Sequence, residues 1–496
     1  MVLGFCPESI RRTGMQQHCL KDNDNQGALR MSCNLVPRWT VGLRTLCCTA
    51  ALVGTVGPVS AKVSQEQADR LLPGGDLTPS GAIRAGNAEG TIPEWTGGLP
   101  LKVVPVGDRH EDPFKDDKPL FTITADNYED HADRLTEGMK AMFRKFPETF
   151  RMHVYPTRRS FSMPEKLYAE TYRNATEVIL VDHDNYSVRL ESGGYPTGGY
   201  PFPIPQHGSE AIINQSMRWI SDGEIYYANQ AVVEPDGGYI VNVQYREFAR
   251  FKSNLNHPSE EGPVTTRLIQ RVEAPPRLAG QMTLTVGSMD PLEAPNRAWT
   301  YNPGQRRVRR APEYAYDAPT ADGLMTRDQS DGFNGALDRY NWRLIGKKEM
   351  YIGYNGYIFQ EDQSVVREED IIQAGHVNQD LARYELHRVW VIEATVKPTE
   401  RHLYPKRVLY VDEDSWLNAA SDIYDSQGKL WRVQDSSITN LYTCLTMTTT
   451  FQANYDLASG RYAIEGLDNK YPPRDTTFYQ PAEYWTPQRL RSMGIR

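Results

Sequence analysis

The sequence predicts a mainly β protein built on a large, curled antiparallel sheet that a few helices cover. The main observation is an alternation of apolar and polar residues, which is the pattern of strands with one buried face. It recurs in Met282–Val286, Trp390–Ala394, Val408–Tyr410 and Leu445–Phe451. Turn-forming stretches such as Pro235–Gly238 and Tyr424–Gly428 separate the strands, and short turns join antiparallel neighbours. The 28 tyrosines and 9 tryptophans, against 14 phenylalanines, suit strand faces that are partly wet.

Ahead of most strands, the chain carries a loop-rich arm and three predicted helices. The arm covers residues 62–125 and opens on a capping box, Ser64–Gln67, before a stretch rich in glycine, proline and aspartate. The β-rich domain covers residues 126–496, with helices expected near 126–146, 164–178 and 209–220. The first helix has the clearest pattern, because its apolar residues recur at three- and four-residue steps until Pro147.

The first 61 residues have the pattern of a targeting segment rather than of a folded domain. Residues 31–61 contain a basic flank, an apolar run and small residues, which predicts a secretory signal peptide cleaved after Ala61. A single membrane anchor is the alternative, but the run is shorter than the ~20 residues needed to span a bilayer. Residues 1–30 show neither a core nor a targeting pattern, so we expect an over-extended start. The mature chain then keeps only Cys444 and forms no intrachain disulfide.

Sequence patterns that carry chemistry are missing. The nine histidines outside the leader show no metal-ligand spacing, and no nucleophile elbow or phosphate-binding loop is present. The sequence therefore predicts no metal, no cofactor and no enzymatic activity. Acidic stretches such as Asp412–Asp414 leave one alternative open, a hydrolase with two carboxyls facing each other across a cleft.

The charge of the chain argues against a nucleic-acid partner. Its net charge is −8, and one dense basic cluster comprises Arg306, Arg307, Arg309 and Arg310. A strand at this position would place Arg307 and Arg309 on one face, and Arg306 and Arg310 on the other. The cluster is either a solvated edge or a docking patch for an anionic headgroup or an acidic partner.

Several long stretches resemble one known family. They are Gly86–Gly98, Asp117–Thr124, Gly199–Pro205, Phe333–Trp342 and Lys347–Ile352. These stretches resemble the DUF1329 family of proteobacterial proteins, often described as outer-membrane lipoprotein-sorting proteins. The resemblance implies a half-open β barrel with a helical lid around acyl chains, a periplasmic location and a partner transporter of the resistance-nodulation-division type. Residues 407–417 and 423–430 look like the carrier hairpin that curls around the ligand.

These features together predict a periplasmic carrier or chaperone for a lipid-like or lipoprotein ligand, working with an envelope exporter. The candidate ligand or lid contacts are soft or aromatic side chains: Met139, Met142, Phe143, Trp390, Tyr410 and Trp416. Two alternatives remain, a periplasmic hydrolase of envelope glycan or ester, and a structural accessory of a transporter that binds no ligand. A peripheral association with the outer membrane is also left open.

Overall fold

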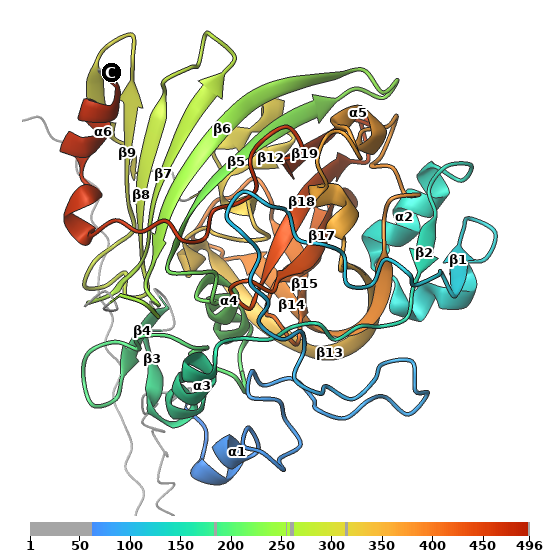
Figure 1. Cartoon of the computed structure of the whole chain (residues 1–496), viewed down its shortest axis with the longest axis horizontal. Helices are drawn as coiled ribbons and strands as arrows, with labels where there is room; N and C mark the ends of the chain where they lie inside the picture. Colours follow the sequence, from blue (N-terminus) through green and yellow to red (C-terminus); the bar gives the residue numbers. More distant parts are fainter. Residues whose placement is uncertain (1–61, 183–185, 254, 258–261, 313–315, 495–496) are drawn as a thin grey trace, which may run out of the picture. The chain divides into compact units, whose positions relative to one another are not determined.

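The computed structural model describes residues 62–182, 186–253, 255–257, 262–312 and 316–494. These residues belong to one unit of the chain, Gly57–Arg496 (Figure 1). The predicted over-extended start, residues 1–30, and the predicted signal peptide, residues 31–61, lie outside the described residues. Among the described helices, none combines the length and the apolar composition needed to cross a bilayer.

A sheet of fifteen strands dominates the fold, which confirms the predicted fold class. Its strands are β1 (Phe121–Ile123), β2 (Met152–Val154), β5 (Gly223–Val233), β6 (Tyr239–Phe251), β7 (Val264–Ala274), β8 (Met282–Ser288), β9 (Arg297–Asn302), β10 (Arg307–Arg310), β13 (Tyr340–Tyr354), β14 (Tyr384–Val396), β15 (Lys406–Asp412), β16 (Asn418–Tyr424), β17 (Leu430–Leu441), β18 (Thr446–Asp456) and β19 (Tyr462–Leu467). The strand order is β1-β2-β14-β15-β16-β17-β18-β19-β5-β6-β7-β8-β9-β10, with β13 alongside β14.

Nearly all neighbours in this sheet are antiparallel. The two exceptions are short parallel contacts, one between β13 and β17 and one between β14 and β2. The predicted turns at Pro235–Gly238 and Tyr424–Gly428 join β5 to β6 and β16 to β17. Each places a glycine at positive φ, Gly237 at +89° and Gly428 at +76°, where a side chain would be strained. Two small hairpins pair β3 (Val178–Asp182) with β4 (Ser187–Leu190), and β11 (Pro319–Thr320) with β12 (Met325–Thr326).

The helices of the described residues are short. The α-helices are α1 (Gln65–Asp69), α2 (Glu137–Lys145), α3 (Glu165–Glu177), α4 (Gly208–Ser216), α5 (Glu368–Ile371) and α6 (Pro487–Gly494). The 3-10 helices are η1 (Tyr128–Arg134), η3 (Ala321–Gly323), η4 (Arg327–Gln329), η5 (Leu337–Arg339), η6 (Tyr357–Gln360) and η7 (Ala482–Tyr484). The predicted capping box is present, because Ser64 and Gln67 cap α1 reciprocally.

Two of the predicted helices differ from the structure. The expected helix over 126–146 is two helices, η1 and α2, since Leu135 between them is extended at φ −114° and ψ 144°. Thr136 then caps α2 by accepting a hydrogen bond from the Met139 amide at 2.9 Å. The apolar periodicity hides this break, because Leu135 is buried in the same core as α2. The helix expected over 209–220 ends at Ser216.

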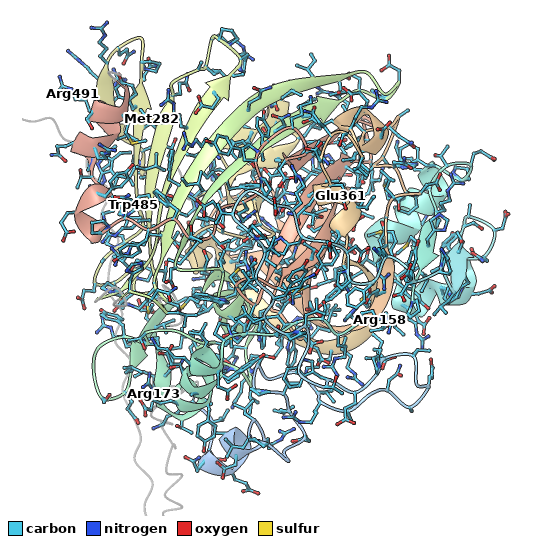
Figure 2. The ribbon with its side chains drawn as sticks, in the orientation of Figure 1. Arg158, Arg173, Met282, Glu361, Trp485 and Arg491 are labelled. Carbon is cyan, nitrogen blue, oxygen red and sulfur yellow. The ribbon has the colours of Figure 1, made fainter. Side chains whose placement is uncertain are left out.

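The two halves of the sheet are covered differently. Strands β14–β19 are largely buried on both faces, within two large apolar cores. Strands β6–β9 bury one face against the C-terminal segment, where Leu284 of β8 packs with Trp485 and with Leu490 of α6. Figure 2 labels Met282 of β8 and Trp485 on this side of the sheet, which is called the α6 face below. The other face of these strands leaves room for a cavity.

Candidate ligand-binding cavity

A cavity of about 430 Å³ lies on the face of β5–β9 opposite the α6 face. Its remaining walls come from α4, from residues 327–337 and from parts of β18 and β19. In Figure 1, α4 lies near the end of these strands that is closest to β3 and β4. The volume falls within the roughly 300–1,000 Å³ that small-molecule sites occupy in proteins.

Strand alternation decides which side chains reach the cavity. Tyr226, Glu247 and Gln270 stand directly opposite one another on β5, β6 and β7, and all three line the cavity. The next residues along β6 and β7, Phe248 and Ile269, belong to the apolar core on the α6 face. The period of two in these strands therefore separates a polar cavity wall from an apolar core.

Part of the cavity wall is apolar. It includes Ile212 and Ile213 of α4 and Met217 just after this helix, together with Phe333 and Leu337. Hydrocarbon placed here would leave water and contact mainly aliphatic and aromatic side chains. Such burial stabilises a complex by about 25 cal/mol per Å².

The polar part of the wall holds a buried ion pair. Nη1 of Arg474 lies 2.8 and 3.0 Å from the two carboxylate oxygens of Glu224 on β5. The same guanidinium lies over the ring of Tyr226, 4.0 Å from its centroid. Arg474 is therefore held by groups of the protein, and its charge is offset within the wall.

Two further carboxyls in the wall have only neutral hydrogen-bond partners. Glu247 accepts a hydrogen bond from Nε2 of Gln270 at 2.8 Å, and Glu465 accepts one from Nε2 of Gln230 at 3.3 Å. Neither makes an ion pair with another described residue. Burial raises the pKa of each carboxyl to about 7, and the charge of Glu247 contributes to raising the pKa of Glu465. Both groups therefore change charge near neutral pH.

One cluster among the described residues has ligand types that could hold a metal ion. It consists of His387, Asp412 and Asp414, all buried, with one ligand atom from each within 4.8 Å of the others. Arg159 binds both oxygens of Asp414, at 2.6 and 2.9 Å. Nε2 of His387 is 3.1 Å from Glu385. Because Arg159 already holds Asp414, the arrangement favours a structural ion network over a metal centre.

This ion network attaches the N-terminal arm to the sheet. Arg159 donates to the backbone carbonyls of Ile83, Arg84 and Pro93 in the arm, at 2.9 to 3.3 Å. Arg388 on β14 donates to the carbonyl of Ala85 at 3.1 Å. The arm has no long strand or helix after α1, so these side chains satisfy backbone groups that a sheet would otherwise pair.

The family of the chain follows from comparison with known proteins. A family model described as "Protein of unknown function (DUF1329)" matches residues 122–491. The chain belongs to the DUF1329 family. It is also 42% identical, over 445 residues, to an uncharacterized protein of Pseudomonas aeruginosa, covering 88% of this chain and 95% of that one. The predicted family is thereby confirmed.

Three solved structures resemble this DUF1329 protein more distantly. A DUF1329 family protein from Desulfovibrio piger is 14% identical, with 57% of this chain and 97% of that chain covered and a TM-score of 0.39. A putative outer membrane lipoprotein-sorting protein domain from Vibrio parahaemolyticus is 12% identical, with 54% and 91% covered and a TM-score of 0.37. A LolA superfamily protein from Nitrosomonas europaea is 14% identical, with 55% and 93% covered and a TM-score of 0.33.

The six predicted ligand contacts do not line the cavity. Met139, Met142 and Phe143 of α2 are buried in one apolar core. Trp390, Tyr410 and Trp416 lie together in another core, where the rings of Trp390 and Trp416 stack at 6.1 Å. The structure thus brings each set of three together, in packed surroundings. A role of these residues in ligand binding stays a prediction.

The basic cluster lies at an edge of the sheet. Arg307, Arg309 and Arg310 belong to β10, which pairs with β9 alone, and Arg306 occupies the turn before it. All four side chains are exposed. Val308 packs against the core on the α6 face, so only one face of β10 contributes to the core. Docking through this patch stays a prediction.

The sequence contained a weak signal for the cavity that did not suffice to find it. Polar residues such as Glu247 and Gln270 alternate with apolar ones in two strands, which is equally the pattern of a strand facing solvent. Glu465 sits in a short apolar strand where a lone acid is unusual. Local periodicity cannot tell a wet outer face from the wall of a cavity, because the covering segments, α4 and residues 327–337, come from elsewhere in the chain.

Proposed function

We propose that this DUF1329 protein is a periplasmic carrier that holds an amphiphilic, lipid-like ligand in the cavity between β5–β9 and α4. The observation that carries the proposal is the cavity itself, whose wall contains both apolar and polar side chains. Burial of hydrocarbon against the apolar side chains supplies affinity, and the polar side chains meet a headgroup. No step of this function requires a reacting side chain.

The size of the cavity limits the ligand. The volume of about 430 Å³ lies toward the lower end of the roughly 300–1,000 Å³ of small-molecule sites. That space suits one chain or a small ring system. For a lipoprotein ligand, only part of the acyl anchor would enter, and the protein part would stay outside.

A lipid-extraction experiment tests the carrier. The protein is purified natively from a periplasmic extract, and bound lipid is identified by native mass spectrometry. We expect a bound amphiphile in the wild type and a lower occupancy in Ala298→Phe, because Ala298 of β9 lines the cavity and a phenyl ring would fill it. Ala458→Phe, in the exposed turn between β18 and β19, is the matched control and should retain the ligand. Repeated recovery of empty wild-type protein would contradict the proposal, as would equal occupancy in Ala298→Phe.

The periplasmic location and the exporter partnership are further parts of the proposal. Secretion predicts a mature protein that begins at Lys62, which N-terminal sequencing of the periplasmic form would check. In-cell cross-linking should then recover a transporter of the resistance-nodulation-division type. A mature form that keeps residues 31–61 would contradict the secretion of this protein through a cleaved signal peptide. Cross-linking that recovers no envelope protein would contradict the exporter partnership. Neither result would contradict the carrier function.

A hydrolase is the second candidate, because the cavity contains carboxyls and tyrosines. Glu247 and Glu465 lie in one wall, and their raised pKa of about 7 suits a general acid at neutral pH. Incubation with envelope glycan and with fatty esters would separate the two functions. A hydrolase requires product formation that is lost in Glu247→Gln, whereas a carrier yields no product with either protein.

A further inference from the structure

Two buried carboxyls in the wall of the cavity, Glu247 and Glu465, make no ion pair with another described residue. We propose that the cavity selects an amphiphile with a cationic, amine-bearing polar end, in preference to a phosphate or carboxylate headgroup. This inference rests on the proposed function and specifies the ligand class. It follows from the two carboxyls, Glu247 and Glu465, that line the cavity without an ion-pair partner among the described residues.

The sheet register places both carboxyls in one wall. Glu247 lies on β6 and Glu465 on β19, and these two strands flank β5 in the sheet. Glu247 stands opposite Tyr226 and Gln270 on its neighbouring strands. Glu465 stands opposite Gln230 and Gln452. The cross-strand neighbours of each acid are thus neutral hydrogen-bonding side chains, and neither acid is held in an ion pair.

Two of the arginines that line the cavity have acidic partners, and a third, Arg327, lowers the pKa of Glu465 through its charge. Arg474 binds Glu224, and Arg218 at the end of α4 binds Asp331 at 2.5 Å. Arg297 of β9 also lines the cavity. The β9 residue in register with Glu247 across the sheet is Thr300, so Arg297 lies three residues along the strand from the level of Glu247. A phosphate or carboxylate beside Glu247 would meet like charge, whereas an ammonium would supply the missing counter-ion.

Protonation should tune this preference. The charged or titratable groups around the two acids are Glu224, Tyr226, Tyr245, Arg327, Asp331 and Arg474. Burial raises the pKa of both acids to about 7, so they are anionic above that pH and neutral below it. An alkyl ammonium with a pKa of about 10.4 stays charged throughout. Its affinity should therefore rise with pH between about 6 and 8, while that of an uncharged alcohol should not change.

Three single-chain probes of equal length test the proposal: dodecylammonium, dodecanol and dodecanoate. Each displaces the neutral dye N-phenyl-1-naphthylamine from the full mature protein, at concentrations below micelle formation. At pH 8 we expect dodecylammonium to bind about tenfold more tightly than dodecanol, as for one charge-assisted contact, and dodecanoate to bind most weakly. At pH 5.5 the ammonium should lose this advantage.

Variants assign the effect to the two carboxyls. The double variant Glu247→Gln with Glu465→Gln keeps the side-chain shape and should bind the ammonium and the alcohol equally at both pH values. Glu273→Gln, an exposed acid on β7 outside the cavity, is the matched control and should behave as the wild type. The pH series on wild-type protein tests the same preference without relying on the folding of any variant.

The outcomes separate this inference from the carrier itself. Equal binding of ammonium and alcohol at pH 8, or tighter binding of dodecanoate, would overturn the ligand class and leave the carrier standing. Failure of all three probes to displace the dye would overturn both. Butylammonium distinguishes an amphiphile from a free amine, because equal affinity without the long chain would show that hydrocarbon burial contributes nothing.

Discussion

The strands β14–β18 and the strands β6–β9 belong to one sheet and differ in how they are covered. In β16, β17 and β18 almost every residue is buried, because helices, the arm and other strands cover both faces. In β6, β7 and β9 most residues are half-buried or exposed. The first group is called the packed half below, and the second the open half.

We expect this difference to separate the residues that stabilise the fold from those that contact a ligand. The packed half contains the large apolar cores and the buried ion network around Arg159. The open half has one small core, on the α6 face, and exposes polar side chains to the cavity. We expect substitutions in the packed half to change the free energy of unfolding, and substitutions in the open half to change ligand affinity.

Breaking the buried ion pair should have the largest effect. Asp414→Asn removes the carboxylate that Arg159 contacts at 2.6 Å and leaves a buried guanidinium, 3.7 Å from Glu413, without its main partner. We expect the free energy of unfolding to fall by about 3–5 kcal/mol in urea titrations. Asp370→Asn, which breaks the exposed pair with Arg367, should cost less than about 1 kcal/mol. An equal loss of unfolding free energy in Asp414→Asn and Asp370→Asn would contradict a stabilising role of the buried ion network.

A matched pair of leucine truncations compares the two halves directly. Leu409 of β15 is completely buried in the packed half, whereas Leu268 of β7 lines the cavity. Leu409→Ala should destabilise by about 2–5 kcal/mol, because it leaves a void in a dense core. Leu268→Ala should cost about 1 kcal/mol, since it enlarges an existing hollow. Similar losses in urea titrations would show that the cavity wall is packed as tightly as the core.

Replacing one buried acid of the packed half should stabilise the protein at alkaline pH. Burial raises the pKa of Asp435 to about 7, and the same group titrates near 3.9 in the unfolded chain. Between these values the folded state binds the extra proton, so this group lowers the free energy of unfolding as pH rises from about 4 to 7. Asp435→Asn should gain about 1–3 kcal/mol at pH 8 and nothing at pH 3.5.

Asparagine at position 435 can still accept the hydrogen bond that Tyr384 donates at 3.0 Å. Thermal melts at several pH values would measure the change. A stabilisation that does not depend on pH would contradict the proton-linked explanation. Glu247→Gln in the open half should show the same pH dependence of stability, because the pKa of Glu247 is also about 7, but it should alter ligand binding as well.

Charge reversal at the edge of the open half should have the smallest effect on stability. Arg307→Glu with Arg309→Glu changes two exposed side chains of β10, so the free energy of unfolding should shift by less than about 0.5 kcal/mol. If the patch docks to anionic surfaces, binding to vesicles containing phosphatidylglycerol should weaken and lose its salt dependence. Arg144→Glu with Arg367→Glu, both exposed elsewhere, is the control. Unchanged vesicle binding in the β10 variant would make the patch a solvated edge.

Local patterns in the sequence predicted much of the fold. Alternation in Met282–Val286 predicted β8 and correctly placed Leu284 on a buried face, and the glycine-containing turns predicted the hairpins that flank β5 and β16. The periodicity over 126–146 missed the break at Leu135, because both helices bury residues in the same core. A local pattern reports which side chains are buried, and it does not report how the backbone turns between them.

The sequence by itself determined the family and the mainly antiparallel sheet, since these follow from motifs and short-range alternation. Only the tertiary structure decided that Met139 and Trp416 lie in packed cores and that Glu247 and Glu465 share a cavity wall. The physical reason is that a cavity is made by segments far apart in the chain. Whether a polar strand face meets water, a core or a hollow depends on what those distant segments cover.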